Sequence, residues 1–597
     1  MAPSPNFSPF LRASLLLIGL AWTVPFLQPY HRFPLAAFYS EWLALALGLA
    51  AAAPLLRREA WRNATLPVIA LAPLGLIVVL GIQVALDRVP YTGQALMAGL
   101  YLSWAALLIL LGQLLRREVS LAQVSTFLAW FLLVGGLLHA LVGLAQHYGL
   151  HPSPLDVLVA RKGEPVVTGN LAQANHYAAS LSFALASAAY LYACRALRGA
   201  SAAPCIALLL VALALAASRS SWLYLAAFLA VALLLLRLRR DDESRRLVRA
   251  AIWLPLVYIA AQWLVMLPIL VPAEGPAMQS SVDRLFEPAT GVKTRLQLWR
   301  EAWRLFLAAP LFGAGFGQFA WQHFLEQAAG GELTTSRVYN HAHNIVVQLL
   351  AEFGAVGALA VMAPTLIWIA DLRSVRLTLE WWWLLALLSI IGIHSMLEYP
   401  LWYAYFLGMA ALLLGLGAQR GVAVRHLGAP RAAAALLVAA GCFNLAAVIS
   451  PYRDFERLFF NAVPQSPQAG GDEAFGAAMM RAHREPLLTP YVELAFALGT
   501  TVDPDRLGTQ LELNTRAMHV APLDVVVYRQ AFLLALAGER EAARIQLERA
   551  LTVYPREAAA FVSELGELAR RHPAEMMPLL ELAAEKSTRQ DARHEHK

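Results

Sequence analysis

Long runs of apolar residues, separated by short polar segments, fill the chain up to about residue 450. A helix needs about 20 mostly apolar residues to cross a membrane. About thirteen segments come close to this length, and we predict a membrane-spanning helix in each of them. The pattern therefore predicts an all-α, polytopic membrane protein. The predicted spans are 10–28, 38–56, 66–86, 94–115, 121–148, 174–194, 202–217, 222–237, 250–272, 345–370, 380–397, 400–418 and 431–449.

Short arginine clusters between the apolar runs predict the orientation of the chain. Lys and Arg gather in the cytoplasmic loops of membrane proteins. If the N-terminus is cytoplasmic, the alternation of spans puts every short arginine cluster on that side, from Arg57 and Arg58 to Arg420 and Arg425. The first apolar run, which follows Arg12, has no small-residue cleavage site after it, so we interpret it as a retained helix.

Three polar regions then fall on the outer side of the membrane. They are a loop at 149–173, a larger loop at 273–344 and everything after about residue 450. In the larger loop, apolar residues recur at helical spacing from Thr294 to Leu307, with arginines between them, which predicts a helix along the membrane interface. We therefore expect a transmembrane domain at 1–449, which includes these first two outer loops, and an outer helical domain at 450–597.

The C-terminal region is less apolar, and proline or glycine interrupts its helix-length segments. From Tyr528 to Pro555, small residues recur and the segment ends in a proline, which resembles one tetratricopeptide-type helix pair at about 520–555. A single pair cannot bury its own apolar face, so flanking helices must cover it. An unrelated helical bundle is the alternative.

The composition excludes several functions. With 59% hydrophobic and 15% charged residues and a mean hydropathy of +0.55, the chain lies outside the range of soluble globular proteins. The net charge of +7 comes from arginines in the loops between spans, so we expect no nucleic acid partner. All three cysteines fall inside apolar segments, which argues against a disulfide framework or a cysteine zinc site.

Three arginines on the predicted outer side are candidates for binding phosphate. Arg219 lies between two short spans, and Arg295 and Arg300 lie on the predicted interface helix. The planar guanidinium can donate two hydrogen bonds to phosphate oxygens, so the three residues together would suit a lipid diphosphate. Alternatively, each arginine simply extends to the lipid headgroups.

The segment from Tyr339 to Asn344 contains two histidines, His341 and His343, directly before a predicted span. A histidine at a membrane surface can take a proton from a hydroxyl group or orient it. Alternatively, Asn344 caps the helix and the histidines are spacers. No third metal ligand lies at a diagnostic spacing, and the first outer loop offers only Glu41, so we expect no metal and no other cofactor.

These residues also resemble a known family. His343 and Asn344, followed after nine residues by Gly354-x-x-Gly357, resemble the signature of the bacterial O-antigen ligase and polymerase superfamily. The glycine-rich segment 313–317 resembles a short element of that superfamily, and it lacks the strand-to-helix context of a nucleotide loop. The segments 168–177 and 398–403 are similar to the protein-modifying branch, the O-oligosaccharyltransferases that glycosylate pilins and other exported proteins.

The resemblance implies a reaction on the periplasmic face of the bacterial inner membrane. A glycan on undecaprenyl diphosphate would be transferred en bloc to a Ser or Thr hydroxyl of an exported, pilin-like protein. Arg219, Arg295 and Arg300 would bind the diphosphate, and His343 would act on the acceptor hydroxyl, in one step that inverts the anomeric carbon. The expected partners are this donor, the acceptor protein and membrane lipids. Further substrate-site candidates are Gln173, Asn175, His176, His341, Asn344, Glu398, Tyr399 and Tyr403.

Three other functions stay open at this point. The superfamily also contains O-antigen ligases, whose acceptor is lipid A core, and polymerases, which extend the glycan itself. A transporter of lipid-linked glycan belongs to another class. It would need ionisable residues at mid-membrane depth, whereas those of this chain lie mostly at the ends of the predicted spans.

Overall fold

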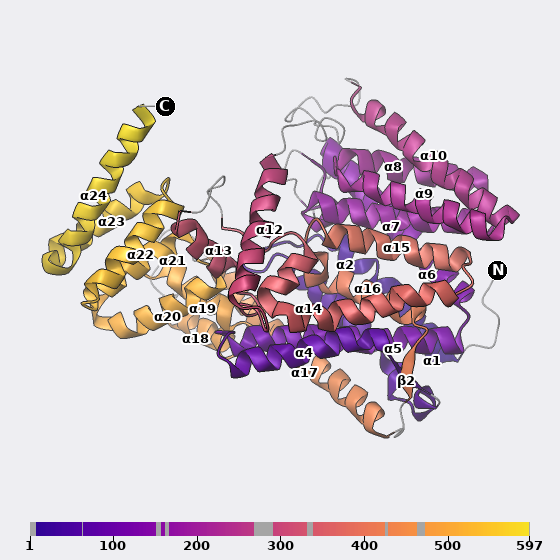
Figure 1. Ribbon diagram of the computed structural model, residues 1–597, viewed down its shortest axis with the longest axis horizontal. Coiled ribbons are helices and arrows are strands. Elements are labelled where there is room, and N and C mark those ends of the chain that lie inside the picture. Colours follow the sequence, from indigo (N-terminus) through magenta and orange to yellow (C-terminus); the bar gives the residue numbers. More distant parts are fainter. Residues whose placement is uncertain are drawn as a thin grey trace. The chain divides into compact units, whose positions relative to one another are not determined.

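A computed structural model describes the chain in eight stretches, and parts of the predicted span 250–272, of both predicted outer loops and of the C-terminal region lie outside them. Within these stretches the chain is almost entirely helical (Figure 1). Two short strands, β1 (Thr65–Pro67) and β2 (Gly421–Ala423), pair antiparallel. The prediction of an all-α polytopic protein is confirmed. The described stretches are 8–62, 64–150, 157–160, 166–267, 290–330, 338–423, 428–461 and 472–595.

Helices occupy the described residues of all the predicted spans. Among the described residues, eight helices are long and apolar enough to cross a membrane, and four shorter ones are also apolar. In chain order, α1 to α10 are Pro9–Ala21, Val24–Leu27, Phe38–Ala51, Leu71–Ala85, Thr92–Glu118, Leu121–Tyr148, Ala174–Ala193, Gly199–Leu215, Ser220–Arg239 and Asp242–Val265. Helices α12 to α17 are Thr290–Ala308, Phe319–Ala328, Ile345–Asp371, Leu379–Ser395, Ala404–Gly417 and Gly428–Asn461.

The described chain forms two compact units. Unit 1 takes the described residues of Met1–Ile77, Leu100–Ala289 and Leu359–Ala446, and unit 2 takes those of Val78–Gly99, Thr290–Ala358 and Ala447–Lys597. The C-terminal helices thus belong to the same unit as α12, α13 and the first half of α14. The boundary that we predict near residue 449 stays a prediction, and the two units are described separately below.

Helix α7 forms the centre of unit 1. Almost all of its residues are buried, because it packs against α6, α8 and α15 (Figure 1). Its many alanines and serines let neighbouring helices approach closely, as small residues do between membrane helices. The Ser187 hydroxyl donates to the Phe183 carbonyl one turn earlier and accepts the indole N–H of Trp383 from α15. This helix therefore gives a fixed base to the loop segment that precedes it.

Helix α14 is broken within its predicted span. Gly354 has φ +67° and ψ −169°, a conformation that only glycine adopts readily. The break leaves backbone groups on both sides without their helical partners, and the glycine-rich segment before α13 supplies new ones. Ala314 donates to the Ala351 carbonyl at 2.8 Å, and Ala355 donates to the Pro310 carbonyl at 2.8 Å. Every such backbone group in a membrane needs a hydrogen-bond partner, and here the two glycine-containing segments supply partners to each other.

The C-terminal helices form a hydrophobic core within unit 2, together with Phe324 of α13. Helices α21 and α22 cover the segment for which we predict a helix pair, and they pack against each other (Figure 1). Tyr528 stacks on Phe561 of α23 with ring centroids 4.4 Å apart. The seven helices α18 to α24 are Asp472–His483, Thr489–Gly499, Leu507–Val520, Asp524–Leu536, Arg540–Val553, Ala558–Arg571 and Pro573–Glu595.

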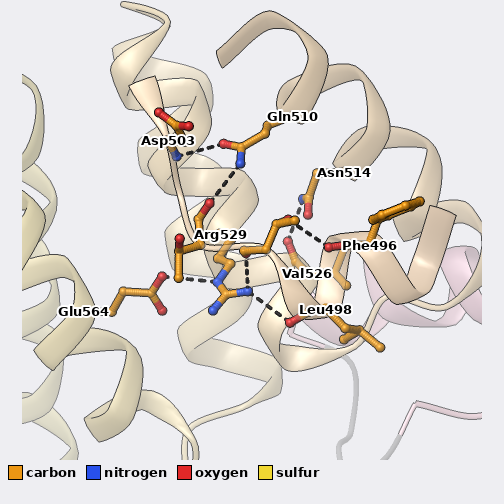
Figure 2. Close-up of polar contacts among 10 residues, drawn as sticks. Phe496, Leu498, Asp503, Gln510, Asn514, Val526, Arg529 and Glu564 are labelled. Atoms are coloured by element: carbon orange, nitrogen blue, oxygen red, sulfur yellow. Dashed lines mark hydrogen bonds and ion pairs between the residues drawn. The ribbon is translucent and has the colours of Figure 1, made fainter. Parts of the chain in front are cut away.

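Arg529 of α21 joins three of these helices. Its guanidinium donates to the carbonyls of Leu498 and Thr500 at the end of α19, at 3.1 and 2.7 Å, and pairs with Glu564 of α23 at 3.1 Å (Figure 2). The last carbonyls of a helix lack helical partners, so this arginine satisfies them while it anchors a third helix. The C-terminal helices are therefore held by a buried core and by polar clamps.

Candidate active site

In unit 1, the structure brings together three of the predicted segments. Asn175, in the first turn of α7, accepts a hydrogen bond from the Ser218 hydroxyl at 2.8 Å and donates to the Glu398 carboxylate at 3.0 Å. The Ser218 and Glu398 side chains are buried. Residues far apart in the chain thus meet around one amide group, which links the segment 168–177 to the segments that contain Arg219 and Tyr399.

Arg219 lies at the start of α9 and is half-buried. Its neighbours Ser218 and Ser220 face each other, with their hydroxyl oxygens 2.8 Å apart. Ala217, two residues before it, has φ +48°, a left-handed conformation that costs an alanine about 1–2 kcal/mol. The backbone between α8 and α9 therefore has a defined conformation, and this conformation fixes the position of the Arg219 backbone.

Aromatic rings surround His176, one residue further along α7. Its ring lies 4.7 Å from the ring of Tyr403 and 5.1 Å from that of Phe406, and both ring pairs are arranged edge to face. Tyr399 stacks on Tyr403 at 6.0 Å. Burial, together with the Glu398 carboxylate, raises the pKa of Tyr399, so its hydroxyl stays protonated. Gln173 immediately precedes α7 and is half-buried.

Polar residues that the sequence motifs did not indicate hold the segment 166–173 in place. Gln146 of α6 accepts the backbone N–H groups of Thr168 and Gly169, each at 3.0 Å. Asn170 donates to the carbonyls of Leu27 and Leu158, at 2.7 and 2.8 Å, and its own backbone N–H donates to a ring nitrogen of His139. Gln146 and His139 lie inside a predicted span, where buried polar groups need partners. Two polar residues inside a predicted span were therefore the feature of the sequence that could have indicated these contacts.

We expect Asn175→Ala to destabilise unit 1 by about 1–3 kcal/mol, because it removes the amide between two buried polar groups, Ser218 and Glu398. Thermal unfolding of the detergent-solubilised protein would measure the change. Asn444→Ala is the matched control, since the Asn444 amide donates to the Ala440 carbonyl of its own helix and links no distant segments among the described residues. Equal unfolding temperatures for the two variants would contradict the bridging role of Asn175.

In unit 2, His343 occupies a constrained loop immediately before α14. Its φ is +53°, in the left-handed region that few non-glycine residues adopt. Its backbone N–H donates to Nδ1 of His341 at 3.1 Å. Burial, with a smaller effect of His343, lowers the pKa of His341 to about 3, so this ring stays neutral and Nδ1 keeps the lone pair that accepts the bond. His341 thus fixes the backbone of His343.

The residue between the two histidines is held on both sides. Ala342 donates to the Gln348 side chain at 2.7 Å, and its carbonyl accepts the indole N–H of Trp299 from α12 at 3.1 Å. Asn344 caps α14, since its side-chain oxygen accepts the N–H of Val346 at 3.0 Å. Three contacts therefore determine the conformation of the loop that carries His343. They come from the start of α14, from the buried Gln348 one turn along, and from the neighbouring helix α12.

Helix α12 carries the two other candidate arginines. Arg295 is half-buried and Arg300 is exposed. Leu298 and Ala302 are buried and pack with Ala342 in a small apolar core. Much of the apolar face that we predict for this helix is exposed, and its Leu296, Trp303 and Leu307 are 45, 48 and 60% accessible. An exposed apolar stripe of this kind is typical of a helix at a membrane surface. Its placement there stays a proposal.

Backbone strain is concentrated in the candidate segments. Among the described residues, six non-glycine residues have positive φ, and three of them lie in these segments: Ala172, Ala217 and His343. Such conformations persist where the surrounding structure determines them, and they cluster at functional sites. This is a reason, independent of the sequence motifs, to place function in these segments.

Comparisons with known proteins agree with the motifs. A family model described as "O-Antigen ligase" matches residues 204–362, and one described as "Virulence factor membrane-bound polymerase, C-terminal" matches residues 382–565. The chain is also 28% identical over 412 residues to "General O-oligosaccharyltransferase" of Acinetobacter baylyi (strain ATCC 33305 / BD413 / ADP1), which covers 68% of this chain and 69% of that protein.

Over residues 204–362 the chain is therefore similar to O-antigen ligases, and over 412 residues it is similar to a general O-oligosaccharyltransferase. These similarities confirm the resemblance that the sequence motifs indicated. The first matched region contains Arg219, Arg295, His343 and the broken part of α14. The second contains Glu398 and Tyr399 and continues through α21 and α22. Both compact units therefore carry family regions.

Proposed function

We propose that this membrane glycosyltransferase transfers a glycan en bloc from a lipid carrier to Ser or Thr hydroxyls of exported proteins. The observation that carries the proposal is the similarity to a general O-oligosaccharyltransferase over more than two thirds of both chains. Two features of the structure support the proposal: the hydrogen-bonded loop that carries His343, and the segments that are joined by hydrogen bonds to Asn175. Both hold polar side chains in a defined geometry, which catalysis needs.

The donor in this proposal is a glycan on undecaprenyl diphosphate. Arg219, Arg295 and Arg300 bind the diphosphate and neutralise the charge that grows on it as the bond to the sugar breaks. That stabilisation is larger in the transition state than in the ground state, so it accelerates the reaction. The arginines supply the positive charge themselves, and the proposal therefore includes no metal ion.

His343 acts on the acceptor. The oxygen of a Ser or Thr hydroxyl attacks the anomeric carbon, the bond from that carbon to the diphosphate breaks, and the hydroxyl proton passes to the His343 imidazole. A single displacement inverts the anomeric carbon. In this scheme, eight further residues shape the donor and acceptor sites: Gln173, Asn175, His176, His341, Asn344, Glu398, Tyr399 and Tyr403.

The acceptor is a pilin-like exported protein, and the reaction takes place at the periplasmic face of the bacterial inner membrane. The arginine distribution among the loops supports this orientation. We assign acceptor docking to the helical domain 450–597, because arrays of helix pairs commonly offer peptide-binding surfaces.

A reconstituted assay tests this function. The purified protein in liposomes receives an undecaprenyl-diphosphate glycan and either a pilin or lipid A core, and glycan attachment to each is measured. Attachment to the pilin supports the proposal. Attachment to lipid A core alone would establish the second candidate, an O-antigen ligase, which the description of the first family model favours. Glycan that crosses the bilayer with no acceptor present would indicate a transporter.

We expect Arg219→Ala to reduce kcat/KM for the lipid-linked donor by about 10²-fold, since a lost charged donor to a developing oxyanion typically costs about that much. Arg219→Lys keeps the charge but not the paired hydrogen bonds, so it should recover only part of the activity. Arg453→Ala, an exposed arginine of α17, is the control. Full activity of Arg219→Ala would remove this residue from the donor site.

A further inference from the structure

A buried polar group lies between α12 and α13 in unit 2, outside the residues discussed so far. Nδ1 of His323 lies 2.5 Å from Oε2 of Glu301, and Nε2 of the same ring lies 2.7 Å from the side-chain nitrogen of Gln327. The side chains of His323 and Glu301 are only 4% and 12% exposed. A carboxylate oxygen can only accept, so Nδ1 carries the hydrogen and Nε2 accepts from the Gln327 amide.

This group touches the loop of His343 through one residue. The ring of His323 lies 5.8 Å from that of Tyr339, and the ring of Tyr339 lies 6.0 Å from that of His343. Both pairs are close to perpendicular, at 67° and 75°, which is a favoured arrangement of aromatic rings. Tyr339 is therefore packed between the buried histidine and the candidate catalytic one.

Helix α13 is fixed from its other side as well. Its Phe324 is fully buried in the core of the C-terminal helices, and its Trp321 lies 4.9 Å from the ring of His519 in α20. Phe319 stacks on His323 at 6.2 Å with an interplanar angle of 14°. The position of His323 is thus set by two cores, and the Glu301 carboxylate sets the rotation of its ring.

We infer that Glu301 and His323 form a positioning pair that holds Tyr339 against His343 and so orients the His343 imidazole toward the acceptor hydroxyl. Burying an ionisable pair costs more than burying two apolar side chains of similar size, so simple packing of α12 on α13 does not require one. A pair of this kind fixes a single ring orientation, which an apolar contact does not. The inference rests on the proposed role of His343 in glycan transfer.

The test compares kcat and KM in the reconstituted transfer assay for His323→Ala, His323→Asn, Glu301→Ala and Glu301→Gln. We expect the two alanine variants to lower kcat about tenfold, since misplacement of a reacting group by a fraction of an ångström has effects of this order, and to leave KM for the donor within about twofold. Glu301→Gln retains an acceptor for Nδ1 and should recover most of the loss.

Two further measurements separate positioning from mere stability. In a Tyr339→Ala background, His323→Ala should cost no additional kcat, because the two residues act as one unit. The control is Arg304→Ala, which breaks an exposed ion pair with Glu326 that joins the same two helices at 3.1 Å. This control should keep wild-type kcat. Thermal unfolding reports whether each variant is folded. If His323→Ala does not fold, the positioning role is tested by comparing kcat of Glu301→Ala with kcat of the isosteric variant Glu301→Gln.

If folded His323→Ala and Glu301→Ala keep wild-type kcat while His343→Asn is inactive, the positioning pair is wrong and the proposed function stands. An additive loss of kcat in the Tyr339→Ala background would also overturn it. If His343→Asn itself is fully active, the proposed role of His343 fails first. These outcomes are distinguishable in one set of assays.

Discussion

Replacing His343 with Asn is expected to reduce glycan transfer by about 10²–10⁴-fold, the range that a lost general acid–base group typically costs. Asn is the most informative replacement because His343 has φ +53°, and Asn adopts this left-handed conformation more easily than other residues with a Cβ. The substitution therefore removes the imidazole and retains the backbone. His343→Ala would add a strain cost of about 1 kcal/mol at the same position.

The measurement is the initial rate of glycan attachment to a pilin in liposomes, with thermal unfolding in detergent as the check on folding. His572→Asn is the matched control, because His572 directly follows α23, far along the chain from the candidate segments, and the proposed mechanism gives its ring no role. We expect wild-type transfer from this control. A folded His343→Asn protein that transfers glycan at the wild-type rate would remove His343 from the mechanism.

Much of the membrane architecture could be predicted because hydropathy and span length are local properties of the sequence. Even α8 and α9, which meet at Arg219, appear where their apolar runs predict them. Helix pairing in the C-terminal region is also local, since α21 and α22 follow each other with a short turn around Gly538. In each case neighbouring residues carry the whole signal.

The polar contacts that shape the candidate site could not be predicted. Asn175 and Glu398 are separated by more than 200 residues, and the motifs that contain them say nothing about a hydrogen bond between them. The same holds for Glu301 and His323, which lie 22 residues apart on two different helices. Such pairs depend on how distant helices pack, and one sequence without an alignment does not contain that information.

The break in α14 shows most clearly how tertiary contacts override a local pattern. By hydropathy the segment is a continuous span, and the glycines at 354 and 357 suggest a family motif without a structural reason for it. The structure supplies the reason at Gly354, where the backbone turns aside and accepts the segment 310–315 as its hydrogen-bond partner. The motif is therefore a docking point for the segment that leads into α13, and a change there should affect both α13 and the loop of His343.

Gly354→Ala is accordingly expected to destabilise unit 2 by about 2–6 kcal/mol, from about 1–3 kcal/mol of backbone strain and a similar cost of overpacking. An added Cβ would lie 2.6 Å from the backbone nitrogen of Gly313 and closer still to the carbonyl oxygen of Leu311, and neither backbone atom can move without losing its hydrogen bonds. We expect little folded protein, and loss of transfer in whatever folds.

The yield of monodisperse protein after solubilisation and its thermal unfolding temperature measure this effect. Gly81→Ala is the matched control, because Gly81 lies in the apolar helix α4, has no positive φ and has nothing within 4 Å of an added Cβ. It should fold and transfer glycan like the wild type. If Gly354→Ala instead gave the same yield and unfolding temperature as Gly81→Ala, α14 would have to be able to close into a regular helix. The docking of segment 310–315 on its broken backbone would then not be needed for folding.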